Sequence, residues 1–192
     1  MSPEWITITI SGTATFAAFA VPIGLHISGV KRDAAKRSRR AENISTMVIS
    51  ELAGLVPSLK AVFQCKGAVE SAENVERLEP LKSRLDLRET PIIDSAIDWI
   101  DDMDRESSAK FSEVYAQVSQ AREALREVYS TEIIHVAQYR YKRLEQLTEY
   151  LLSSIKKFVQ TTSHLNPELS EMFIAELDAE LNRFVIHDTR KV

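Results

Sequence analysis

The run of residues 5–30 is the feature that most restricts how this chain can fold, because it contains no Asp, Glu, Lys or Arg. About 20 apolar residues in a helix cross the hydrocarbon core of a bilayer, so the run is long enough. Its Ser and Thr side chains can donate to carbonyls of their own helix, and membrane helices tolerate a residue such as Pro22. We expect residues 1–30 to form a single N-terminal transmembrane helix.

Basic residues follow this run directly, and they predict how the chain is oriented. They are Lys31, Arg32, Lys36, Arg37, Arg39 and Arg40. Basic flanks stay on the cytoplasmic side, which places the N-terminus outside and the C-terminal domain in the cytoplasm, at a plasma or inner membrane. Basic residues beside a span also attract anionic headgroups, so membrane lipids are expected partners. We assign residues 31–43 as a basic juxtamembrane segment.

Two other interpretations of the N-terminal run are less well supported. Ala18, Phe19 and Ala20 match the small-x-small pattern of a signal-peptide cleavage site, but no basic residue precedes them. Residues 6–10 alternate Ile and Thr as a strand would, yet a lone strand cannot satisfy its backbone in lipid. A retained transmembrane helix is therefore favoured over both.

The net charge of −4 is unevenly distributed along the chain. In residues 1–40 the six basic residues outnumber Glu4 and Asp33 to give +4, which leaves −8 for residues 41–192. Nucleic-acid binding needs a basic face against the phosphates, so an acidic domain argues against it. We expect no nucleic-acid partner.

The rest of the chain has the periodicity of amphipathic helices, with apolar residues at steps of three and four. The periodic stretches are residues 44–63, 93–128, 133–158 and 169–184. Only five Gly and six Pro argue against a turn-rich β fold, and Pro57 predicts a kink or break in the first stretch. Residues 67–90 are less regular and are expected to be a connector. We predict an all-α fold, in which residues 44–192 form a cytoplasmic antiparallel bundle of long helices after the anchor.

Two helix starts are marked by a capping residue followed by proline. Thr90 precedes Pro91, and Asn166 precedes Pro167, so helices are expected to begin at these prolines. The first of them is predicted to continue as one long helix through residue 128, frayed near Ser107.

Opposite charges predict how the two central helices pair. Residues 89–106 carry a net −6, and residues 139–157 carry a net +3. An antiparallel hairpin with its turn at residues 129–132 would bring Lys156 and Lys157 close to the acidic stretch.

No motif in the chain predicts catalysis or metal binding. Glu132 and His135 form one Glu-x-x-His step, whereas a di-iron bundle needs two such steps and further carboxylates. The acidic residues Asp94, Asp98, Asp101, Asp102, Asp104 and Glu106 lack the glycine-bearing loop of an EF-hand. Cys65 falls on an apolar stripe and is expected to be a core residue. We therefore expect no enzymatic activity, no metal and no cofactor.

Small residues within the predicted span are candidates for self-association. Ala20, Gly24 and Ser28 recur every four residues, and small side chains let two membrane helices approach closely. A homo-oligomer is therefore a further hypothesis.

These features predict a membrane-anchored helical protein that acts through protein–protein contacts as a tether, adaptor or regulatory subunit. The sequence does not identify the protein partner. One alternative is a membrane effector whose span self-assembles and perturbs the bilayer. A second is a metal-dependent enzyme that uses the carboxylates named above.

Overall fold

The computed structural model describes the backbone of residues 3–188 and the side chains of residues 30–179, except for residues 86 and 88. Every regular element in this part of the chain is helical, which confirms the all-α prediction. The chain divides into two compact units, Met1–Arg40 and Ala41–Val192. The first α-helix, α1 (Pro3–Glu70), includes the residues of the strand alternative, which is therefore wrong.

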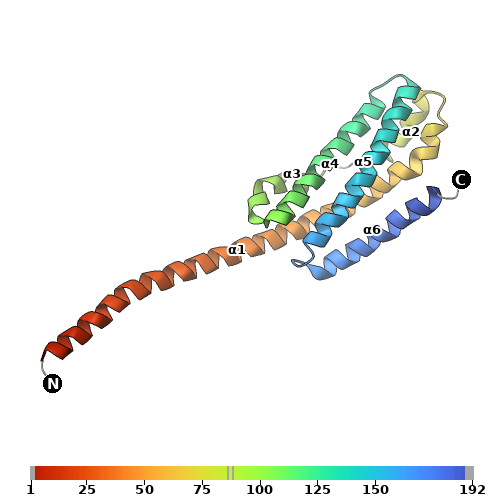
Figure 1. The fold of residues 1–192 in the computed structure, drawn as a ribbon. Helices are drawn as coiled ribbons and strands as arrows, with labels where there is room; N and C mark the ends of the chain where they lie inside the picture. The colour runs from red at the N-terminus through yellow and green to blue at the C-terminus, as the bar shows by residue number, and fades with distance from the viewer. Residues whose placement is uncertain (1–2, 86, 88, 189–192) are drawn as a thin grey trace. The chain divides into compact units, whose positions relative to one another are not determined.

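Within Ala41–Val192 the long helices form the predicted antiparallel bundle. Residues 41–70 of α1 pack with α4 (Arg105–Tyr129), α5 (Ile134–Thr161) and α6 (Pro167–Asp188). Figure 1 shows α4 and α5 as an antiparallel hairpin, with α6 beside α5. The predicted start of the last helix is confirmed, because Asn166 Oδ1 accepts a hydrogen bond from the amide of Leu169 at 3.3 Å.

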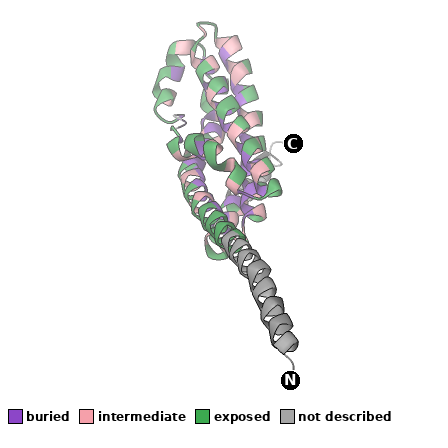
Figure 2. Ribbon diagram, turned by 90° about the vertical axis from the view of Figure 1, so that its left-hand side faces the viewer, coloured by how far each residue is buried: buried purple, intermediate pink, exposed green. Residues whose placement is uncertain are grey.

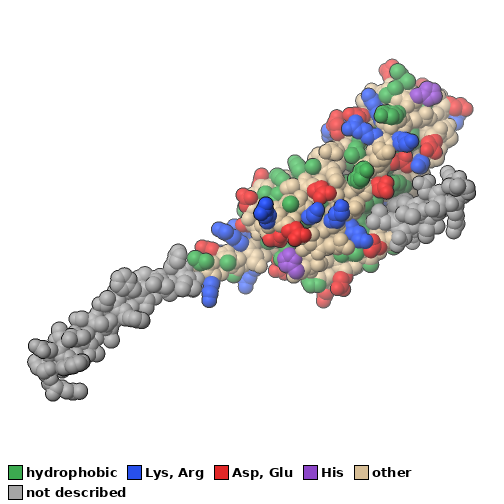
Figure 3. Space-filling view, viewed as in Figure 1, with side chains coloured by type: hydrophobic (Ala, Val, Ile, Leu, Met, Phe, Trp, Pro, Cys, Tyr) green, Lys and Arg blue, Asp and Glu red, His purple; other side chains and the backbone are tan. Residues whose placement is uncertain are grey.

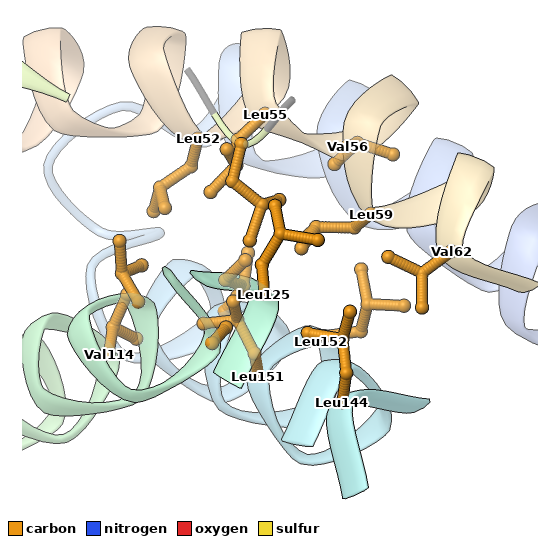
Figure 4. Packing of buried hydrophobic residues seen from close by; sticks show 14 of the residues in the cluster. Leu52, Leu55, Val56, Leu59, Val62, Val114, Leu125, Leu144, Leu151 and Leu152 are labelled. Carbon is orange, nitrogen blue, oxygen red and sulfur yellow. The ribbon is translucent and has the colours of Figure 1, made fainter. Parts of the chain in front are cut away.

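The core of this unit is built from the apolar stripes of the three longest described helices. Leu52, Leu55, Leu59 and Val62 of α1 point toward residues of α4 and α5 (Figure 4), and Val56 belongs to the same core cluster. The buried residues alternate with exposed ones along each helix (Figure 2), as expected for amphipathic helices. Phe111 of α4 and Phe158 of α5 meet with ring centroids 5.9 Å apart, and both are fully buried.

No break occurs at Pro57, because α1 is helical on both sides of it. A proline inside a helix costs about 3 kcal/mol. Burial of a Leu or Val side chain contributes about 1.5–3 kcal/mol, and Leu55, Val56 and Leu59 around Pro57 are all buried. The free energy gained by burying these three side chains exceeds the cost of the proline. The side chain of Pro57 itself is exposed.

Shorter elements connect α1 to α4. They are two 3₁₀ helices, η1 (Val75–Leu78) and η2 (Ile97–Asp102), and two short α-helices, α2 (Glu79–Lys82) and α3 (Pro91–Ala96). The single long helix predicted from Pro91 is wrong, because the chain becomes extended at Met103 before α4 begins. Met103 is buried, and Asp104 caps the new helix. The break therefore precedes the expected fraying point at Ser107.

The start of α3 lies where the sequence predicts it, but Thr90 does not cap it. Glu51 of α1 does so instead, with carboxylate oxygens that accept hydrogen bonds from the amides of Ile92 and Ile93 at 3.1 and 2.7 Å. The buried Thr90 accepts a hydrogen bond at 2.7 Å from Arg122 of α4. Side chains of α1 and α4 thus fix the connecting segment at this point.

The antiparallel hairpin is confirmed, but the predicted charge pairing is wrong. Lys156 forms an ion pair with Asp178 of α6 rather than with the acidic stretch. Ser154 donates a hydrogen bond to Glu113 at 2.7 Å, so this end of α5 lies beside Glu113, about two helical turns from the expected register. The acidic stretch instead has its own contact, an ion pair between Asp94 and Arg122 at 3.5 Å.

Replacement of Asp104 tests the break before α4. The Asp104 carboxylate accepts hydrogen bonds from the Ser107 hydroxyl at 2.5 Å and from the amides of Glu106 and Ser107 at 2.9 and 3.0 Å. Asp104→Ala should lower the free energy of unfolding by about 0.5–2 kcal/mol at pH 7. Urea unfolding of the full chain in detergent, followed by circular dichroism, measures this change.

The stability that Asp104 contributes should depend on pH. The hydrogen bond from Ser107 holds the pKa of Asp104 below its usual value. Its charged form therefore contributes stability that is fully present above pH 3.9 or so and is lost as pH falls through the lowered pKa. Asp104→Asn keeps a capping side chain without this titration, so the advantage of the wild type over this variant should shrink below about pH 4. An advantage that stays constant down to pH 2 would contradict the assigned cap.

Candidate functional site

The basic side chains of residues 31–40 are all exposed, and they form the most concentrated charge in the described chain. Six positive charges and the single negative charge of Asp33 give this stretch a net +5. At about 100° per residue the six bases spread over about 240° of the helix surface. Figure 3 shows basic side chains extending from this segment next to the grey residues. We call residues 31–40 the basic segment.

The distribution of the bases limits how the basic segment can meet a membrane. The remaining sector of the helix, about 120° wide, holds only Ala34 and Ser38. A helix that lies in the plane of the interface needs a face of large apolar residues, which this segment lacks. Its geometry instead suits a helix that passes through the headgroup layer, with cationic side chains directed outward around it.

Length and composition allow one helical segment of the described chain, Val30–Glu70, to cross a membrane. The core helix of a bundle meets the same criterion, and Val48, Leu52 and Leu59 of this segment are buried in the core. The N-terminal helix α1 is therefore long and apolar enough to span a membrane, although its later part forms the bundle core. The side chains of the predicted anchor, including Ala20, Gly24 and Ser28, lie outside the described residues.

A second candidate surface lies on the outer face of α5. Tyr139 and Tyr150 are 76% and 66% exposed, and their spacing of eleven residues places them within about 20° on one face, about 16 Å apart. Arg143 and Gln146 lie between them and are also exposed. Arg143 forms an ion pair with Glu127 of α4 at 3.3 Å. We call these four residues of α5 the tyrosine face.

The tyrosine face was not predicted from the sequence, although the sequence contains a signal for it. Both tyrosines fall on the polar side of a clearly amphipathic helix, where a solvated face carries Lys, Glu or Gln. Single exposed aromatic residues are common on protein surfaces, but Tyr and Arg together are enriched at protein interfaces.

The residues considered for metal binding do not come together. Glu132 precedes α5, His135 lies in its first turn, and both are exposed. Asp94 pairs with Arg122, whereas Asp104 caps α4. Among the described side chains, no group of three or more His, Cys, Asp or Glu residues is arranged to hold a metal ion.

Cys65 lies in the core, as predicted, and its surroundings do not activate it. Burial raises the pKa of the Cys65 thiol, with a smaller opposing effect from Arg84. Burial also raises the pKa of Tyr129 and the pKa of Tyr141. The Tyr141 hydroxyl donates a hydrogen bond to the carbonyl of Val62. A nucleophilic cysteine needs a lowered pKa and access to solvent, so Cys65 is a packing residue.

No family model matches this chain, and neither a similar curated protein nor a similar solved structure was found.

Proposed function

We propose that this protein is a single-pass membrane protein that holds its helical bundle at the cytoplasmic face and contacts another protein there. It then acts as a tether, adaptor or regulatory subunit rather than as an enzyme. The observation that carries this proposal is the basic segment, whose exposed cations directly follow 26 residues without a charged side chain. Basic residues directly after an uncharged span are the usual signal that keeps the following domain in the cytoplasm.

The tyrosine face supports the second half of the proposal, contact with a protein. Large, rigid Tyr side chains supply contact area at low entropic cost, and Arg143 can form directed hydrogen bonds. The acidic and basic side chains elsewhere on the visible face of the bundle are interspersed rather than gathered (Figure 3). The tyrosine face is therefore where we place the contact.

Photo-crosslinking in intact cells tests this placement. A photoreactive amino acid is introduced at Tyr139, at Tyr150 or, as a matched control, at Met172 of α6, which is 64% exposed. The two α5 positions should give the same crosslinked species, and Met172 should not. An adduct of twice the chain mass would identify a second copy as the partner.

A comparison of crosslinking from the three probe positions decides whether the contact lies at the tyrosine face. Equal crosslinking from all three positions, or none from either tyrosine position, would contradict a contact at the tyrosine face. A double replacement, Tyr139→Ser with Tyr150→Ser, should weaken crosslinking from a probe at the neighbouring Gln146 without unfolding the bundle, because both tyrosines are exposed.

A further inference from the structure

We propose that the basic segment selects anionic phospholipids around the protein, by direct contact between its cationic side chains and lipid phosphates. This inference rests on the proposed membrane anchor and adds the chemical class of lipid that surrounds it. Its partner is the headgroup of an acidic phospholipid in the cytoplasmic leaflet, not free phosphate.

The first support is that five of the cations have no partner among the described residues. Lys31, Arg32, Lys36, Arg37 and Arg39 form no ion pair there, and all five are exposed. Bases in the bundle are commonly paired, as Lys82 is with Glu79 at 2.6 Å. Cations so close together repel one another, and external anions relieve that repulsion.

The second support is the shape of the basic segment. Its ten residues rise about 14 Å along the helix, enough to cross one headgroup layer and reach water. The bases point in most directions around the helix, so they can contact several lipids at once. Long Lys and Arg side chains suit this arrangement, because their stems can lie along the acyl boundary while the charge meets a phosphate. The neighbouring Ala34, Ala35 and Ser38 are small and do not obstruct them.

Spin-labelled lipids provide the test, with the full-length chain reconstituted into phosphatidylcholine vesicles. Electron spin resonance measures the fraction of labelled lipid that the protein immobilises. Labelled phosphatidylglycerol should be preferred over labelled phosphatidylcholine by about twofold or more at low salt, and the preference should fall in 0.5 M NaCl. Replacement of Lys31, Arg32, Lys36, Arg37 and Arg39 by Gln should abolish this preference.

A matched variant separates local contact from total charge. Arg77, Arg105, Arg126, Lys142 and Lys157 lie in the bundle, and their replacement by Gln changes the net charge by the same amount. This control should keep the preference. Equal preference in the wild type and the five-base variant, or equal loss in the control, would overturn the inference.

Two further outcomes separate this inference from the proposed anchor. If neither labelled lipid is immobilised, the chain is not embedded, and the anchor itself fails. If both are immobilised equally at low salt, the anchor stands and the lipid selection fails. Inorganic phosphate, at an ionic strength matched with NaCl, should not compete beyond the salt effect. Specific competition would mean that the segment binds free phosphate and would overturn the assignment to lipid.

Discussion

Phe158→Ala is expected to lower the free energy of unfolding of the bundle by about 3–5 kcal/mol. Phe158 is fully buried in α5 and packs against Phe111 of α4 at a centroid distance of 5.9 Å. Its removal loses apolar burial and leaves a cavity between the two helices of the hairpin. Domains of this size are typically stable by about 5–15 kcal/mol, so this one change removes a large part of the total.

Urea unfolding of the full chain in detergent measures this loss by circular dichroism. Tyr150→Ala is the control, because it removes another aromatic side chain from the same helix at a position that is 66% exposed. It should change the free energy of unfolding by no more than about 0.5 kcal/mol. A similar small change for Phe158→Ala would mean that α5 does not face α4 with this side.

Neutralisation of the whole basic segment should convert a single membrane orientation into a mixture. The six replacements are Lys31→Gln, Arg32→Gln, Lys36→Gln, Arg37→Gln, Arg39→Gln and Arg40→Gln. Only basic residues within about 15–20 residues of a span set orientation strongly, and the next one, Lys60, lies 30 residues beyond Val30. No Lys or Arg precedes residue 31, so the variant keeps no nearby charge bias.

A topology reporter fused after Val192 measures the fraction of chains with a cytoplasmic bundle. The control replaces six bundle bases by Gln, namely Arg77, Arg105, Arg126, Lys142, Arg143 and Lys157. It has the same net charge as the test variant and should keep the wild-type orientation. An unchanged orientation in the test variant would show that the basic segment does not determine topology.

Helix positions could be predicted where apolar periodicity and local capping agree. The stripe that includes Leu144, Leu151 and Phe158 predicts α5, and Asn166 with Pro167 marks the start of α6. Periodicity misled the prediction at Met103, because the apolar spacing continues across a break that Asp104 stabilises. An apolar stripe indicates which residues are buried, but it does not indicate whether the backbone between them stays helical.

Contacts between distant parts of the chain could not be predicted from local sequence. Glu51 caps α3 from 41 residues away, and Gln138 donates to the carbonyls of Val69, Glu70 and Ala72 at 3.1–3.3 Å, where α1 ends. The hairpin register also depends on such contacts, because Arg140 donates to the carbonyl of Glu127 at 2.6 Å. Net charge alone therefore placed Lys156 beside the wrong partner.

The two candidate sites also differ in how far local sequence predicts them. The basic segment is a local cluster, so its place could be read from the sequence, and the structure adds that its side chains are exposed. The tyrosine face depends on which side of α5 the bundle leaves open, and the packing of α4 and α6 against α5 determines that side.

Cysteine labelling of the otherwise wild-type chain tests the central claim, a membrane-anchored protein with its bundle in the cytoplasm. Cys65→Ala removes the native thiol, and single cysteines are placed by Ser2→Cys or by Gln160→Cys at an exposed position of α5. A membrane-impermeant maleimide is then applied to intact and to lysed cells, and membranes are washed with alkaline carbonate. The chain should stay in the washed membranes, with Ser2→Cys labelled in intact cells and Gln160→Cys labelled only after lysis. Release of the chain by carbonate, or labelling of Gln160→Cys in intact cells, would contradict the account.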